Sequence, residues 1–274
     1  MMLHKTGLSI GCMMLSAGAF AGVSDITTAN NQVGIQIIST HVNYTESGNG
    51  QYGSSTGKLD TESGRIPGYS LSVSTMQDLS EGGGYFQAEF DHSNGDTNYV
   101  GGLTGSTSTP YGSVTGISSA VLVDYSGRFG KGFAVGDKFM LTPYAELGRH
   151  EWDRGVNAGE TYTNNYYGAG ALAQYSPVGS LVISANVMLG NTYKSYIAVN
   201  GAFSGELGNS TIAKVGLGAD YALAKNLHVN IGAEYTNFSY GISSVYPVGG
   251  GYVAWEPASR TSYTTVKAGL GYAF

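Results

Sequence analysis

The feature of this sequence that most constrains its fold is a strict period-two alternation of apolar residues with small or polar ones. The alternation is clearest in four segments of the second half, 181–189, 213–221, 227–235 and 266–274. In 227–235, Leu, Val, Ile, Ala and Tyr alternate with His, Asn, Gly and Glu. Because successive side chains of a β-strand point to opposite faces, each segment predicts a strand with one apolar and one hydrophilic face.

The composition favours a sheet of this kind over a soluble enzyme fold. Charged residues make up 12% of the chain, about half of the roughly 25% usual in soluble domains. The mean hydropathy is −0.07, so no large apolar core replaces the missing charge. There are 43 glycines and 21 tyrosines, which suit a sheet with a small-polar face and glycine-rich loops. The net charge of −6 gives no basic footprint for nucleic acid.

Such strands can lie in a membrane only if the sheet closes on itself. The longest apolar run after the N-terminal region is Ala120–Val123, far short of the roughly 18 apolar residues that a transmembrane helix needs. In lipid every backbone polar group needs a partner within the protein, and only helices and closed barrels provide this. We therefore predict an all-β fold, a transmembrane up-and-down antiparallel β-barrel.

We predict about ten strands, with eight as the alternative. In the first predicted strand, 33–44, the alternation of apolar residues changes phase between Ile37 and Val42, for which a β-bulge would account. In addition to the four segments above, the predicted strands are 33–44, 69–76, 85–91, 117–129, 139–150 and 166–175.

The connections between these strands alternate in length, as they do in outer-membrane barrels. This pattern predicts long extracellular loops, short periplasmic turns and both chain termini in the periplasm. The long connections are 45–67, 92–116, 151–165, 192–210 and 237–262, and the short ones are 77–84, 130–137, 176–180 and 222–226.

The N-terminus predicts export from the cytoplasm. Residues 1–21 contain Lys5, an apolar stretch and the small–x–small pattern Ala19–Ala21, which together are typical of a signal peptide cleaved after Ala21. The predicted barrel domain is then 22–274, located in the cell outer membrane. The only cysteine, Cys12, lies in the signal peptide, so the mature chain has no disulfide, thiol chemistry or Cys-based zinc site.

Tyrosines fall near the ends of the predicted strands, which indicates the aromatic girdles of a membrane barrel. These tyrosines are Tyr44, Tyr69, Tyr125, Tyr175, Tyr221, Tyr235 and Tyr272.

Two segments resemble those of known outer-membrane proteins. The alternating, Phe-terminated stretch 266–274 resembles their C-terminal strand, which implies that the barrel-assembly machinery is a partner. The segment Leu141–Gly148 is similar to the Thr-Pro-Tyr strand of OmpA-type and opacity-type barrels. The residues that carry the predicted assembly signal are Val266, Ala268, Leu270, Tyr272 and Phe274.

Ten strands also suggest a comparison with the omptin proteases, which resemble this chain in strand number and use carboxylate pairs and an Asp–His pair at the barrel rim. Asp91–His92, His150–Asp153 and His41 lie near predicted strand ends. None of them reproduces the paired motifs of that family. We therefore predict no enzymatic activity, with a rim hydrolase acting on peptides or lipid A as the alternative.

The inward faces of the predicted strands carry charges of both signs, which must pair or sit in water inside a narrow barrel. A paired network would block the barrel, whereas a hydrated set would line a small selective channel. Small inward residues such as Gly168 and Gly170 leave volume and point toward a partly wet interior. We nevertheless favour the network, because ten strands enclose far less than the 16–18 strands of open porins. The predicted lumen charge network is Glu89, Asp91, Asp124, Arg128, Glu146, Lys214, Asp220, Glu234 and Lys267, with His228 beside it.

No cofactor or metal is predicted. The segment Asp91–Asp96 resembles a calcium loop but lacks the spacing and the closing Glu of an EF-hand.

The predicted loops are rich in Gly, Ser, Thr, Asn and Tyr, notably in 97–116 and 239–255. This composition is typical of adaptable binding surfaces. We therefore predict a rigid barrel whose surface loops serve adhesion or ligand contact, with a small porin-like channel as the alternative. The expected partners are outer-membrane lipid and lipopolysaccharide, and an extracellular ligand or small solutes.

Overall fold

The computed structural model describes residues 22–51, 56–102, 109–157 and 159–274. The predicted signal peptide and its cleavage site at Ala21 lie outside these residues. No helix in the described part of the chain is long and apolar enough to span a membrane.

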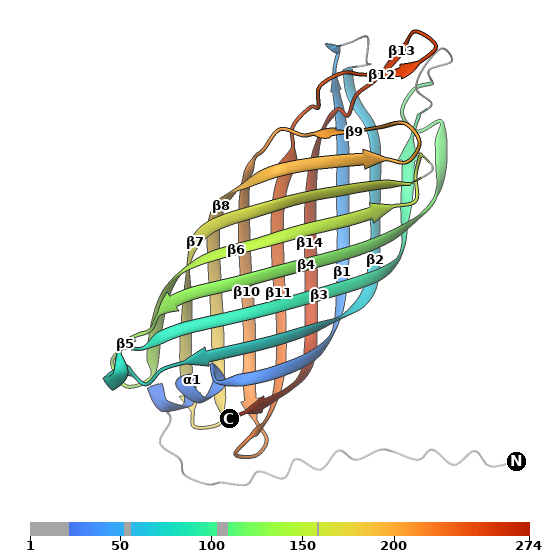
Figure 1. The fold of residues 1–274 in the computed structure, drawn as a ribbon. Coiled ribbons are helices and arrows are strands. Elements are labelled where there is room, and N and C mark those ends of the chain that lie inside the picture. The colour runs from blue at the N-terminus through green and yellow to red at the C-terminus, as the bar shows by residue number, and fades with distance from the viewer. Residues whose placement is uncertain (1–21, 52–55, 103–108, 158) are drawn as a thin grey trace, which may run out of the picture.

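Ten long antiparallel strands form a closed barrel (Figure 1), as the alternation predicts, and the alternative of eight strands is wrong. Closure comes from β14 pairing with both β1 and β11, and from β8 pairing with β10. The barrel strands are β1 (Gln32–Asn49), β2 (Thr56–Met76), β3 (Gly84–Gly101), β4 (Val114–Lys131), β6 (Phe139–Arg154), β7 (Glu160–Val178), β8 (Leu181–Val199), β10 (Thr211–Ala222), β11 (Leu227–Tyr240) and β14 (Ala258–Ala273).

Short elements lie at both ends of the barrel. At the end that carries the long connections, which we call the loop end, are β9 (Phe203–Glu206), β12 (Tyr246–Gly249) and β13 (Tyr252–Ala254). At the opposite end, which we call the terminal end, lie α1 (Val23–Ala29), the 3-10 turn Leu79–Glu81 and β5 (Phe133–Val135) (Figure 1). The C-terminus also lies at the terminal end, as an even strand count requires.

A belt of apolar side chains faces outward over the half of the barrel nearer the terminal end. In β1 the exposed residues are Val33, Ile35 and Ile37, and in β8 they include Ile183 and Leu189. This is the face that the sequence pattern assigns to lipid, and the intervening Ser and Asn side chains of β8 point inward. An outward apolar surface of this extent is stable against hydrocarbon and not against water.

The two faces exchange polarity above the belt. Beyond Ile37, the outward residues of β1 are polar, as at Asn43, whereas Val42 and Tyr44 are buried inside the barrel. The predicted bulge between Ile37 and Val42 is wrong, because β1 pairs with β2 without a shift as far as Glu46. The alternation of β1 therefore keeps its phase. Its outward residues face lipid in the belt and water above it, and its inward residues above the belt pack into an apolar core.

The strands therefore continue far into segments for which the sequence predicts loops. β2 has 21 residues and begins at Thr56, thirteen residues before its predicted start. This length is about twice the nine to eleven residues that a tilted strand needs to cross a membrane. The barrel consequently extends well beyond the belt on its loop end (Figure 1).

The outward tyrosines fit the predicted girdles, with one correction. Tyr44 is wholly buried inside the barrel, because it lies on the inward face of β1 above the belt. The six exposed on the outer surface are Tyr69, Tyr125, Tyr175, Tyr221, Tyr235 and Tyr272.

Candidate functional site

Helix α1, which the sequence does not predict, packs against β6, β7 and β8 at the terminal end of the barrel. Ile26 of this helix is fully buried. Ser176 on β7 donates a 3.1 Å hydrogen bond to Asp25, and the side chains of Asn30 and Gln174 exchange hydrogen bonds of 2.7 and 3.1 Å. We call this helix and the buried residues near it the lower plug; the latter are Met76, Tyr85, Met140, Leu172 and Val182.

Charged side chains of the predicted network form a second layer, which we call the ionic layer. Arg128 on β4 contacts Glu146 on the adjacent β6 at 2.8 Å and Glu234 on β11 at 3.3 Å. In the closed ring, β4 and β11 lie five strands apart in either direction. The guanidinium of Arg128 therefore bridges opposite walls of the lumen.

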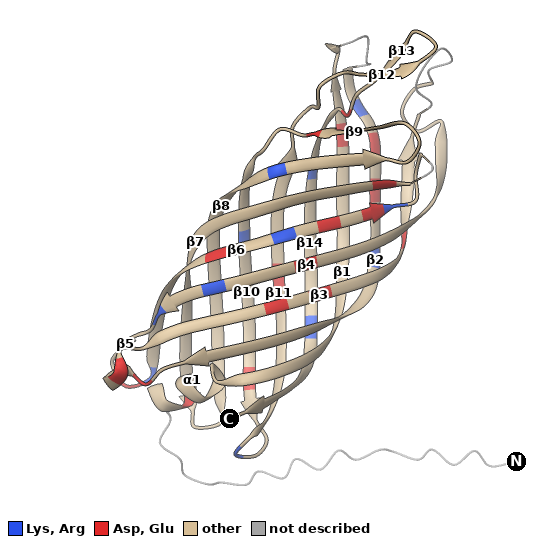
Figure 2. Ribbon diagram, in the orientation of Figure 1, with Lys and Arg blue, Asp and Glu red and all other residues tan. Residues whose placement is uncertain are grey.

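Two lysines complete the ionic layer. Lys214 Nζ lies 3.0 Å from Glu146 and 3.5 Å from Glu234. Lys267 Nζ lies 2.7 Å from Glu89 and 2.6 Å from Asp91. Figure 2 shows such charges along the strands of the barrel body as well as at its ends.

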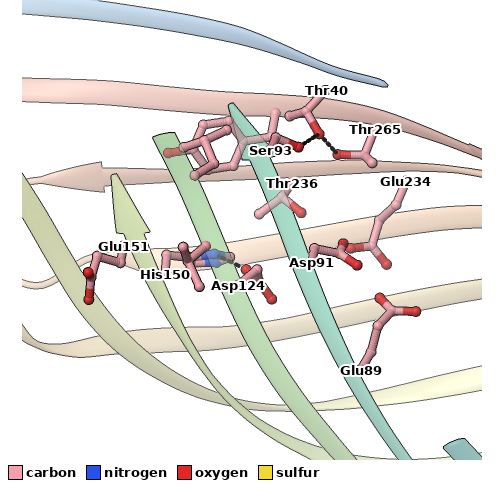
Figure 3. Close-up of a pocket in the computed structure, with 13 residues that line it drawn as sticks. Thr40, Glu89, Asp91, Ser93, Asp124, His150, Glu151, Glu234, Thr236 and Thr265 are labelled. Carbon is pink, nitrogen blue, oxygen red and sulfur yellow. Dashed lines mark hydrogen bonds and ion pairs between the residues drawn. The ribbon is translucent and has the colours of Figure 1, made fainter. Parts of the chain in front are cut away.

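The other two residues of the predicted network have histidine partners. Asp124 contacts Nδ1 of His150 (Figure 3). Asp220 lies apart from the ionic layer near the terminal end, where it contacts His228 at 2.5 Å and accepts a hydrogen bond from Gln32 at 3.1 Å.

The space above the inward glycines is occupied by tyrosine rings. Gly148 lies directly opposite Tyr166 in the register of β6 and β7, and Gly170 lies opposite Tyr144. A Cβ atom at Gly148 would lie 2.2 Å from the Tyr166 ring, and one at Gly170 would lie 2.5 Å from the Tyr144 ring. Aromatic rings commonly cover glycines on a neighbouring strand in this way. The inference from small residues to a partly wet interior is therefore wrong at Gly170.

A third layer, which we call the aromatic layer, fills the lumen above the belt. His150 stacks between Tyr166 and Phe238, with ring centroids 4.7 and 5.1 Å away. The hydroxyls of Tyr44 on β1 and Tyr162 on β7 lie 3.2 Å apart, although these strands are also five apart in the ring. The layer consists of Tyr44, His150, Trp152, Tyr162, Tyr166, Phe238, Tyr240 and Tyr263.

A small polar cavity of about 40 Å³ is lined by residues of both the ionic and the aromatic layers (Figure 3). Buried polar atoms of Asp91, His150 and Tyr263, all lining residues, make no hydrogen bond within the protein. A buried water needs roughly 10–15 Å³ and several polar partners. The cavity therefore has room for a few water molecules and none for a peptide or a lipid.

The lumen at the loop end, which we call the mouth, holds a charged cluster that the sequence does not predict. Arg154 at the end of β6 contacts Glu62 at 2.7 Å, Glu160 at 3.1 Å and Asp60 at 3.4 Å. Its guanidinium also lies over the Tyr44 ring at 4.4 Å. All four charged residues are buried. They fall in the long connections 45–67 and 151–165, for which the sequence predicts extracellular loops.

One signal in the sequence could have revealed this mouth cluster. The even positions of β6 continue inward through His150, Trp152 and Arg154, and the odd positions Arg149, Glu151 and Asp153 face outward. Period two is thus kept above the belt with the polarity of the faces reversed. A search for outward apolar residues alone stops at Leu147.

The residues compared with the rim of omptin proteases do not converge on one site. His150 reaches Asp124 inside the barrel, but its side chain is only 6% exposed. His92 faces outward and lies against Tyr69 at 5.4 Å, whereas Asp91 points into the lumen. No group of three or more metal-ligating side chains occurs among the described residues.

Comparisons with known proteins identify the fold. No known protein family and no curated protein matches the sequence. The solved outer-membrane protease OmpT of Escherichia coli superposes with a TM-score of 0.59 at 10% identity, covering 90% of this chain and 98% of that one. The translocator domain of the autotransporter NalP of Neisseria meningitidis gives a TM-score of 0.44 at 15% identity, covering 92% of each chain.

The chain therefore has the fold of outer-membrane β-barrel proteins. Within that class it is a ten-stranded barrel, similar in architecture to OmpT. At 10% identity the likeness extends to the fold alone.

Proposed function

We propose that this protein is a closed, non-enzymatic barrel of the outer membrane that holds binding loops above the cell surface. The loop end is extracellular, and the termini are periplasmic. The single observation that carries the proposal is contact between opposite walls of the lumen. Arg128 reaches Glu234 across the barrel in the ionic layer, and Tyr44 reaches Tyr162 across it in the aromatic layer.

These contacts favour a rigid support over the channel alternative. An ion crossing the barrel would have to displace paired charges and then pass a layer of packed rings. Removing an ion from water into a dry environment costs tens of kcal/mol when no partner compensates it. Cross-lumen pairs also stiffen the barrel, which suits a support for loops.

The binding surface is the loop end, where apolar and aromatic side chains are exposed beside glycines. In the β12–β13 hairpin, Val248, Tyr252 and Val253 are exposed. The hairpin is fixed at its base, where Tyr246 stacks on Phe203 of the preceding loop with ring centroids 5.4 Å apart. Exposed tyrosines on a fixed base give large contact area at low entropic cost.

Two further partners belong to the proposal. The outward belt contacts outer-membrane lipid, and the polar outer surface above it contacts lipopolysaccharide. The barrel-assembly machinery reads the exposed face of β14, which carries Leu270 and Tyr272, together with Phe274 directly after the strand.

The contact between His150 and Asp124 is the one observation that favours a hydrolase instead. A general base must reach the proton that it abstracts directly or through one water. The His150 ring is stacked between two aromatic rings above a cavity of about 40 Å³. A peptide or lipid substrate does not fit there, so we propose that this pair is structural.

Adhesion of cells that display the protein tests the binding function. Changing both Tyr252 and Val253 to Ser removes the exposed apolar surface of the hairpin and should lower attachment to host-cell monolayers several-fold. Leu223→Ser is the matched control, because Leu223 is also exposed but lies in the short turn 222–226 at the terminal end. Equal attachment of all three strains, at equal surface display, would overturn the proposed role of the hairpin.

Planar-bilayer recordings of the refolded full chain test the closed lumen. We expect no single-channel steps from the wild type or from Glu146→Gln, because the aromatic layer is intact in both. Stable ion-selective steps from the wild type would establish the channel instead.

A further inference from the structure

The segment 241–257, which contains the β12–β13 hairpin, has a single charged residue, and this residue is buried. Glu256 is only 6% exposed, although it lies two residues before β14 at the rim of the barrel. The rest of the segment consists of Gly, Ser, Tyr, Pro, Trp and aliphatic residues. The only acid of the loop therefore points inward, under the loop, instead of into water.

Glu256 connects this loop to the aromatic layer. Tyr162 on β7 donates a 2.5 Å hydrogen bond to Oε1 of Glu256, and Tyr44 on β1 donates one of 3.4 Å to the same atom. At the backbone, the two ends of the loop are joined where Ser243 N–H donates to the Glu256 carbonyl at 2.9 Å. The Ser243 hydroxyl accepts a 2.8 Å hydrogen bond from Glu256 N–H. The Glu256 side chain thus links this loop, whose two ends are joined at Ser243, to two strands of the barrel wall.

The charges around Glu256 are predominantly negative. Glu46 on β1, Asp60 and Glu62 on β2, and Glu160 on β7 are the nearby acids, and Arg154 on β6 is the nearby cation. Arg154 forms ion pairs with Asp60, Glu62 and Glu160. Among the described residues, Glu256 forms no ion pair, so its carboxyl is held by tyrosine hydroxyls alone.

We propose that Glu256 is a proton-operated latch, which holds the last loop on the mouth of the barrel while its carboxyl is neutral and releases the loop when the carboxyl ionises. This inference rests on the proposed function, because it makes the orientation of the binding hairpin depend on external pH.

The direction of the effect follows from proton linkage. Burial, and then the negative charge of Glu160, raise the pKa of Glu256 to about 8 from 4.5. In a released loop the carboxyl is in water and regains its ordinary pKa. The docked state is therefore fully stabilised below pH about 4.5, and this stabilisation is lost as the pH rises through about 8. Between these pH values the equilibrium constant for docking of the loop falls by up to about tenfold per pH unit.

A spin label on the hairpin measures loop position directly. Cys12→Ser removes the one natural cysteine. Val248→Cys on β12 then provides the site to which a nitroxide is attached. In the wild-type background we expect an immobilised spectrum at pH 5.5 and a growing mobile fraction up to pH 9. Glu256→Gln is neutral at every pH and keeps a carbonyl oxygen to accept from Tyr162, so its spectrum should stay immobilised throughout.

Glu206→Gln is the matched control, because Glu206 is an exposed acid on β9 at the same rim. It should show the pH transition of the wild type. The latch is overturned if the wild-type label is equally immobile at pH 5.5 and 9, or if Glu256→Gln keeps the transition. If Glu256→Gln does not fold, the wild-type titration still decides. No ligand is present in this measurement, so its outcome is independent of whether the hairpin mediates adhesion.

Discussion

At the residue scale, burial separates the ion pairs that hold the barrel together from those on its outer surface. Arg154 and Arg149 both lie on β6, five residues apart, and so point to opposite faces. The side chain of Arg154 is 1% exposed among three carboxylates, whereas that of Arg149 is 42% exposed and pairs with Glu151 at 3.3 Å. An exposed pair contributes little to stability, but breaking a buried one leaves charges without compensation.

Arg154→Met should therefore lower the free energy of unfolding by about 3–5 kcal/mol, because Glu62 and Glu160 lose their cation inside the mouth. Denaturant unfolding of the refolded barrel in detergent measures this loss. The same change at Arg149 on the outer face should cost at most about 1 kcal/mol. Equal effects of the two substitutions would contradict a stabilising role for the buried cluster.

The inward charges of the ionic layer could be predicted from the sequence, because they alternate with lipid-facing residues such as Leu147 and Val215. Their partners could not, because Arg128 meets Glu234 only once the ring has closed. The mouth cluster does not follow from the sequence for another reason. On β6 the outward neighbours of Arg154 are charged. Charged residues like these are typical of a loop, but here they belong to a strand whose outer face meets water.

At the element scale, the sequence predicts the part of each strand whose outer face is apolar because it contacts lipid. It does not predict the part above the belt, where the outer face contacts water. β1 illustrates both cases, since its alternation is clear as far as Ile37 and reverses by Val42. The helix α1 has seven residues. Helices this short are not stable alone, so its presence depends on packing against the barrel, which local sequence does not reveal.

Ile26→Asp tests that dependence, because it places a carboxylate at a fully buried position of α1. The helix should leave the lower plug, and the backbone amides of 23–31 should exchange with solvent at least tenfold faster, as measured by hydrogen–deuterium exchange. Thr28→Asp introduces the same charge on the exposed face of the helix and should leave exchange nearly unchanged. If protection survives Ile26→Asp, the helix is not held by its apolar side chain.

At the scale of the whole molecule, three layers of side chains follow one another along the lumen, and we propose that each of them closes it. The lower plug, the ionic layer and the aromatic layer occupy successive levels. In the lower plug Asn30, just after α1, contacts Gln174 on β7, and the other two layers include contacts between strands that are not neighbours. An ion needs one continuous path of water, so any single intact layer is sufficient to stop it. This arrangement differs from a channel with a gate, in which the loss of one element opens the pore.

A series of variants distinguishes these arrangements. Ile26→Asp perturbs the lower plug, Arg128→Ala removes the cross-lumen contact of the ionic layer, and Tyr162→Ala truncates a ring of the aromatic layer. We expect each single variant to remain silent in planar bilayers at about 100 mV, because two layers stay intact. Steps should appear only when all three changes are combined, with a size that grows with salt concentration. If Arg128→Ala alone conducts, the ionic layer is the sole barrier, the aromatic layer admits water, and the protein is a gated pore instead of a closed support.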